Sequence, residues 1–188
     1  MRRKTFDVLF ETSTGLTALV KQPCLWRSGY YFTLSIGLFT GVVTNTWFLD
    51  NFIGERIAII LATVVILATA LAMYGFLLHG IMETFGALAG DPVGLICLLG
   101  YTTLPFLLLT PVALLSAKLG VEGIPLLLIA IGVGLLWMLY LLVKSLEVVY
   151  LIDTLRASVA IIFSLLLLYV VFLLPIQLGL TVLINALL

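Results

Sequence analysis

Side chains that could do chemistry are few in this chain, and most of them lie in pairs close to the ends of long uncharged runs. They are His79 and Glu83, four residues apart, Lys144 and Glu147, three apart, Asp153 and Arg156, also three apart, and the single Asp91. Residues three or four apart share one face of a helix, so each pair can interact locally. An ionisable side chain inside lipid is a functional candidate by default, but these positions fall at helix ends.

These charges allow two interpretations. In the first, they form a polar site on one side of the membrane that binds a partner protein, a lipid headgroup or a proton. In the second, they form an interfacial collar, in which Lys and Arg reach the headgroups and the acids neutralise them in local pairs. Lys144 is about 20 residues into its helix, or about 30 Å, which is where the hydrocarbon ends. That position favours the collar.

Catalytic and cofactor motifs are not recognisable in the sequence. One histidine with scattered carboxylates, here His79 with Glu83, Glu147 and Asp153, is a weak metal pattern, because metal sites usually cluster their ligands more tightly. No Ser-His-Asp arrangement stands out around the single histidine, and neither a glycine-rich phosphate loop nor a nucleophile elbow is present. We therefore expect no enzyme activity, no cofactor and no metal site.

Prolines interrupt two of the hydrophobic runs and offer a second kind of site. Pro105 and Pro111 fall in the third run and Pro175 in the fifth, and each removes a backbone donor and frees a carbonyl. Broken helices form substrate sites in some transporters, whereas proline kinks packed against neighbours are commoner. The lack of a charge beside the breaks favours the packed kink. The side chains that can satisfy part of the freed backbone are Thr102, Thr103, Thr110 and Gln177.

The elements that position these residues are predicted to be membrane-spanning helices. The chain has 188 residues, of which 63% are hydrophobic and 10% charged, and its mean hydropathy is +1.32. A soluble domain keeps about a quarter of its residues charged. We therefore expect an all-α integral membrane protein, a bundle of about five transmembrane helices. The predicted spans are about 30–49, 57–80, 94–117, 124–146 and 159–185.

The distribution of lysine and arginine predicts the orientation of the bundle. Arg56 and Lys118 fall on one side of the five spans. The other side holds the remaining seven, which are Arg2, Arg3, Lys4, Lys21, Arg27, Lys144 and Arg156. The N-terminus is therefore expected in the cytoplasm and the C-terminus outside. The formal net charge of zero gives no field that would attract nucleic acid.

Residues 1–29 are expected to form a cytoplasmic N-terminal segment before the transmembrane domain, 30–188. Apolar residues recur at helical spacing within residues 5–21, and bases flank this stretch, which predicts an amphipathic helix. We expect this helix to lie in the inner membrane interface. The alternatives are a helix packed on the bundle and a frayed tail.

Small residues and cysteines in the chain are interpreted as packing features. Gly37 and Gly41 form a GxxxG pattern in the first span, which supports close helix packing and only hints at a dimer. Cys24 and Cys97 show neither a disulfide framework nor a metal spacing. They are most simply reduced packing residues.

Two stretches of the sequence resemble a known family. Gly100-Tyr101-Thr102-Thr103-Leu104-Pro105, in the third span, is similar to the GYxxxP motif of the Yip (Ypt-interacting protein, YIPF) domain family. Residues 137–147, followed by 154–157, resemble the end of the fourth span and the start of the fifth in bacterial members. The five-span layout, with the N-terminus inside and the C-terminus outside, agrees with the family. The positions that the resemblance singles out are Tyr101, Pro105, Lys144 and Glu147, and it implies no catalytic residue.

The resemblance is to the compact bacterial or archaeal type. Eukaryotic members carry a long cytosolic segment and are associated with Rab GTPases and vesicle traffic between the ER and the Golgi. That segment and the family's DLYGP motif have no counterpart here, so GTPase binding is not expected.

The sequence thus predicts a non-enzymatic membrane protein that organises the bilayer or binds partners at its cytoplasmic face. The expected surroundings are a lipid bilayer, a protein partner or a homo-oligomer, and a prokaryotic plasma membrane. The alternative function is a small transporter or channel with its site at the broken third and fifth helices. It requires a polar cavity at Thr102, Thr103, Pro105, Thr110 and Gln177.

Overall fold

The computed structural model of the chain describes residues 8–9, 12–21, 23–44, 53–87, 90–173, 175 and 177. Within these ranges the backbone is helical with short connections and contains no strand, which confirms the all-α fold. The elements are α2 (Thr12–Val20), α3 (Leu25–Val43), α4 (Ile53–Thr84), α5 (Pro92–Tyr101), α6 (Leu104–Lys118), the 3-10 turn η2 (Gly120–Gly123), α7 (Ile124–Tyr150), α8 (Thr154–Leu168) and the π-helix η3 (Tyr169–Leu173).

Four helical segments of the described chain are long and apolar enough to cross a membrane: Ile53–Thr84, Pro92–Lys118, Gly120–Tyr150 and Thr154–Val171. They correspond to the second to fifth predicted spans. The first predicted span, 30–49, begins inside α3, which is 19 residues long and packs on α4, α5 and α6. The last residues of the first and fifth predicted spans lie outside the described residues. The transmembrane helix bundle is confirmed, and the number of five stays a prediction.

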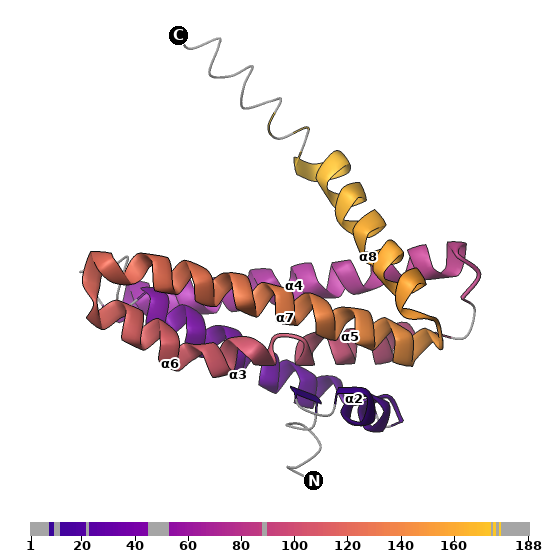
Figure 1. Ribbon diagram of the computed structural model, residues 1–188, viewed down its shortest axis with the longest axis horizontal. Helices are drawn as coiled ribbons and strands as arrows, with labels where there is room; N and C mark the ends of the chain where they lie inside the picture. The colour runs from indigo at the N-terminus through magenta and orange to yellow at the C-terminus, as the bar shows by residue number, and fades with distance from the viewer. Residues whose placement is uncertain are drawn as a thin grey trace.

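Helices α3 to α7 lie side by side along the long axis of the molecule and enclose the core (Figure 1). One apolar cluster joins α4, α5, α7 and α8 around buried residues such as Leu78, Leu98 and Leu141. A second cluster lies between α3, α6 and α7, where the rings of Phe39 and Phe106 pack edge to face, 5.2 Å apart. Large apolar side chains are exposed along α4, α7 and α8, as suits a protein whose solvent is lipid.

Helix α2 packs on the bundle. Leu16 and Val8 are fully buried within the first core cluster, Leu9 is buried there as well, and α2 contacts α5 and α7. The predicted amphipathic helix therefore exists, but protein rather than lipid covers the middle of its apolar face. This favours the packed alternative over the interfacial position that we expected. The partner surface belongs to helices more than seventy residues away, which the pattern within 5–21 does not reveal.

Helices α5 and α6 form one span, broken at Thr102 and Thr103 just before Pro105. The Thr102 hydroxyl donates to the carbonyl of Leu99 at 2.7 Å, and the Thr103 hydroxyl donates to that of Gly100 at 2.9 Å. The helix is thus broken just before Pro105, and the two threonine hydroxyls bond to carbonyls of the preceding turn, not to the carbonyl of Tyr101 that the proline frees.

The other two prolines behave differently. Pro111 was expected to interrupt the third span, but α6 continues through it, so that prediction was wrong. Pro111 removes only the helical bond to the carbonyl of Leu107, and the close packing of α7 on α6 supports the continuous helix. Pro175 is exposed and follows η3 by two residues, so the fifth span does lose regular α-helical geometry before this proline.

The GxxxG pattern lies at a contact between two helices of the same chain. A Cβ added at Gly37 would lie 3.8 Å from Val64, and one added at Gly41 would lie 3.4 Å from Ile60, both on α4. These glycines therefore let α3 approach α4, and they do not mark a free dimer face.

Helix α8 turns away from the bundle after its first turns (Figure 1). Its buried face is narrow and consists mostly of small side chains, namely Ala157, Ala160, Ile161 and Ser164. The hydroxyl of Ser164 donates to the carbonyl of Ile161 at 2.7 Å and lies 2.8 Å from the hydroxyl of Tyr74 on α4. Because the single Ser164 proton is used on Ile161, Tyr74 is the donor of the bond between α4 and α8.

Replacing Tyr74 by phenylalanine should weaken the attachment of α8 by about 0.6–1.7 kcal/mol, the range for hydrogen bonds between helices in membranes. The measurement is a double-mutant cycle with Ser164→Ala, read as unfolding free energy in bicelles. Tyr140→Phe, at a half-exposed tyrosine of α7, is the control and should have little effect. Strictly additive effects of Tyr74→Phe and Ser164→Ala would contradict this prediction.

Candidate functional site

The charged residues singled out in the sequence gather at one end of the bundle, where α4 ends, α5 begins and α7 turns into α8 (Figure 1). We call this region the charged end, and it comprises His79, Glu83, Asp91, Lys144, Glu147, Asp153 and Arg156. Helix α2 lies at the same end of the molecule (Figure 1). Residues far apart in the sequence thus come together because the helices run antiparallel and their connections are short.

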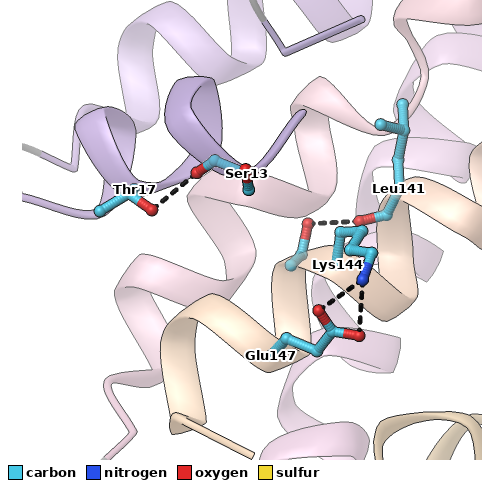
Figure 2. Close-up of polar contacts among 6 residues, drawn as sticks. Ser13, Thr17, Leu141, Lys144 and Glu147 are labelled. Atoms are coloured by element: carbon cyan, nitrogen blue, oxygen red, sulfur yellow. Dashed lines mark hydrogen bonds and ion pairs between the residues drawn. The ribbon is translucent and has the colours of Figure 1, made fainter. Parts of the chain in front are cut away.

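Lys144 and Glu147 form the best-shielded ion pair of the charged end. The Lys144 Nζ donates to both carboxylate oxygens of Glu147, at 3.0 and 2.7 Å, and the two side chains are 26% and 18% exposed. Figure 2 shows this pair on α7, with the Ser13–Thr17 turn of α2 nearby. Thr154, the first residue of α8, lies close to the Glu147 carboxylate. The pair is therefore located where α7 ends and the next helix begins.

His79 is held between two partners. Its Nδ1 lies 2.6 Å from the hydroxyl of Tyr150, at the end of α7, and its Nε2 lies 3.3 Å from a carboxylate oxygen of Glu83. With the carboxylate facing Nε2, the neutral ring carries its proton there and Nδ1 accepts from Tyr150. The ring of Tyr150 in turn covers Gly90, where a Cβ would overlap it. The predicted His79–Glu83 pair is present, and Tyr150 ties it to α7.

The remaining charges of the charged end have simpler roles. Asp91 is the N-cap of α5, and its carboxylate accepts from the backbone N–H groups of Val93 and Gly94 at 3.1 and 2.9 Å. Arg156 lies 3.4 Å from Asp153, but these side chains are 72% and 61% exposed, so the ion pair contributes little to stability.

A cavity of about 250 Å³ opens at the charged end, between the α4–α5 connection and the α7–α8 connection. Arg156 is its charged lining residue, and Phe85, Tyr150 and Ile152 supply much of the rest. Leu151, also in the lining, ends α7 with a φ of 54°, a left-handed conformation unusual for leucine. The α7–α8 connection therefore forms one wall of the cavity and contains a residue in an unusual backbone conformation.

The GYxxxP segment forms a packed contact. Tyr101 is buried, with its ring centroid 5.6 Å from that of Tyr31 on α3. Gly100 lies against Ser28, where no Cβ would fit. Pro105, Thr102 and Thr103 are buried as well, and both threonine hydroxyls are used on carbonyls of the preceding turn.

This packing does not favour the transport alternative. Of the residues that would line its cavity, Gln177 is exposed and accepts from Tyr169, at 3.4 Å, in its own segment. Thr110 is half-buried and bonded to its own helix. The five expected lining residues are therefore not seen converging on one polar space.

Two residues of these contacts escaped the sequence analysis. Tyr150 is about 70 residues from His79, and Ser28 is about 70 residues from Cys97, whose carbonyl accepts a hydrogen bond from the Ser28 hydroxyl. No local spacing signals such contacts. For Asp91, by contrast, the following Pro92 was a usable signal, because Asp before a first-turn proline is typical of a helix start.

The described chain is all-α and contains four apolar helices long enough to cross a membrane. Polar side chains within it are bonded at helix ends and at one proline break. These features define a polytopic integral membrane protein. Comparison with protein families gives a match to the Yip1 domain over residues 6–174. The chain belongs to the Yip1 domain family. Neither the curated proteins nor the solved structures contain a significant match to it.

Proposed function

We propose that this protein is a non-enzymatic organiser of the membrane that binds protein or lipid partners through the charged end. The observation that carries the proposal is that three of the four acidic side chains of the charged end are exposed, whereas its two basic side chains, Lys144 and Arg156, are both paired with acids of the same region. Of the acids, Glu83 and Asp153 are 57% and 61% exposed, and Asp91 is exposed as well.

An exposed acidic surface at a membrane selects its partners by charge. It attracts a basic protein segment or an amine headgroup. The engagement of both ring nitrogens of His79 supports a structural role for this histidine over acid–base catalysis. We therefore propose binding, and not turnover, as the activity of this end.

The proposed location is a prokaryotic plasma membrane, with the N-terminus and the charged end on the cytoplasmic side. The lysine and arginine distribution supports this orientation. It places the acidic surface where basic segments of cytoplasmic partners or a second copy of the chain can reach it.

Mass spectrometry of the protein extracted in native-membrane nanodiscs tests the proposal. The variant Glu83→Gln/Asp153→Asn removes two exposed negative charges at the charged end with little change in side-chain size. The matched control is Glu55→Gln/Glu122→Gln, which removes two exposed acids at the opposite end of the bundle. We expect a specific protein or amine lipid that co-purifies with the wild type and the control to fall at least tenfold in the first variant. Equal recovery from all three proteins would overturn the proposal.

A further inference from the structure

The two cysteines of the chain, 73 residues apart, meet where α3 begins beside α5. The backbone N–H of Cys24, the N-cap residue of α3, donates to the Sγ of Cys97 at 3.2 Å. Ser28 fixes this contact from both sides. Its hydroxyl donates to the carbonyl of Cys97 at 2.6 Å, and its N–H donates to the carbonyl of Cys24 at 3.0 Å.

The two thiols are within reach of each other. The Cα of Cys24 lies about 1.5 Å from its own nitrogen, so it is at most about 4.7 Å from the Sγ of Cys97. In a disulfide the Cα of one cysteine and the Sγ of the other are roughly 4 Å apart. We expect rotation of the two side chains to bring the sulfurs together. Cys24 is half-buried and reachable by a small reagent, whereas Cys97 is 1% exposed.

We infer that Cys24 and Cys97 form a modification site, a dithiol that a hydroperoxide oxidises to an intramolecular disulfide. The Cys24 thiol gives up its proton, and its thiolate attacks an oxygen of hydrogen peroxide; the O–O bond breaks, a Cys24 sulfenic acid is formed, and the departing hydroxide takes up the released proton to become water. The Cys97 thiol likewise gives up its proton, and its thiolate attacks the Cys24 sulfur; the S–O bond breaks, and the departing hydroxide takes up that proton to become a second water. The two thiols lose two electrons, and one hydrogen peroxide is reduced to two waters.

The disulfide would join the beginning of α3 to the middle of α5, three residues before Gly100. It would thus fix the connection between α2 and α3 on the helix that carries the GYxxxP segment. On the predicted orientation both thiols lie toward the cytoplasm, where thiols are normally kept reduced. The site is therefore a reversible response to oxidant and not a permanent structural bond.

The test uses the full chain in nanodiscs, treated with hydrogen peroxide, quenched with catalase, denatured and alkylated with N-ethylmaleimide. Since the chain has only two cysteines, the intact mass reports the state of both. We expect the reduced protein to carry two adducts. The oxidised protein should be a monomer with no adduct and a mass lower by two hydrogens, and dithiothreitol should restore both adducts.

A distance control separates this geometry from general thiol reactivity. In Cys24→Ser/Trp26→Cys the first thiol moves two residues along α3, to a position where the native side chain is 86% exposed and faces away from the bundle. This variant should keep both adducts under the same peroxide dose. The inference is overturned if wild-type thiols both remain alkylatable, if they end as sulfinic acids or linked dimers, or if the control closes a disulfide equally fast.

Discussion

Replacement of Gly100 by alanine is expected to lower the free energy of unfolding by about 3 kcal/mol, at the upper end of the usual range for overpacked cores. A Cβ on Gly100 would overlap the hydroxyl oxygen of Ser28 and lie 3.0 Å from the Ser28 carbonyl oxygen. That hydroxyl cannot swing away without losing its bond to the carbonyl of Cys97. The measurement is the unfolding free energy of the purified protein in bicelles.

Two companion variants make the Gly100 result specific. Gly29→Ala is the control, because a Cβ on Gly29 meets nothing within 4 Å, so this change should be neutral or slightly stabilising. In a Ser28→Ala background, which removes the overlapping hydroxyl, Gly100→Ala should cost about half as much. If Gly100→Ala were no more harmful than Gly29→Ala, the close approach of α3 and α5 would be refuted.

Removing one partner of the Lys144–Glu147 pair should have the second large effect. Glu147→Leu leaves the Lys144 ammonium half-buried without its carboxylate, and we expect a loss of about 2 kcal/mol of unfolding free energy. Fully buried pairs lose about 3–5 kcal/mol, and the 26% and 18% exposure of these side chains reduces that figure.

The double variant Lys144→Leu/Glu147→Leu distinguishes an unpaired charge from lost packing. With both charges gone, stability should return to within about 1 kcal/mol of the wild type, since apolar replacements of a shielded pair are often neutral. Asp153→Asn breaks the exposed pair with Arg156 and should change stability by less than about 1 kcal/mol. A double variant as unstable as Glu147→Leu alone would show that the charge itself is not the cause.

The spans and the break at Pro105 could be predicted because they depend on local chemistry. A helix that crosses lipid needs about twenty apolar residues, and a proline has no backbone N–H to donate. Both features can therefore be recognised from consecutive residues. The same holds for the His79–Glu83 and Lys144–Glu147 pairs, whose spacing places both members on one helix face.

Other features depend on which helices pack together, and the spacing of residues along the sequence does not reveal which helices do so. Tyr150 completes the contacts of His79 only because α7 ends beside α4. Pro111 leaves α6 intact because a proline removes only one helical bond and the packing of α7 supports the helix. The two cysteines looked like isolated packing residues until α3 and α5 brought them together.

The burial of α2 has a consequence for how the chain is made. Leu16 needs α7 to complete its surroundings, yet Leu146 of α7 is synthesised 130 residues later. At about 5–20 residues per second, the ribosome needs roughly 7–26 seconds to cover that distance. During this interval the part of α2 that α7 covers has only earlier helices such as α5 beside it, and the membrane surface is another apolar phase within reach. The amphipathic pattern of α2 is therefore suited to the lipid interface while the chain is being made, as well as to its final place on the bundle.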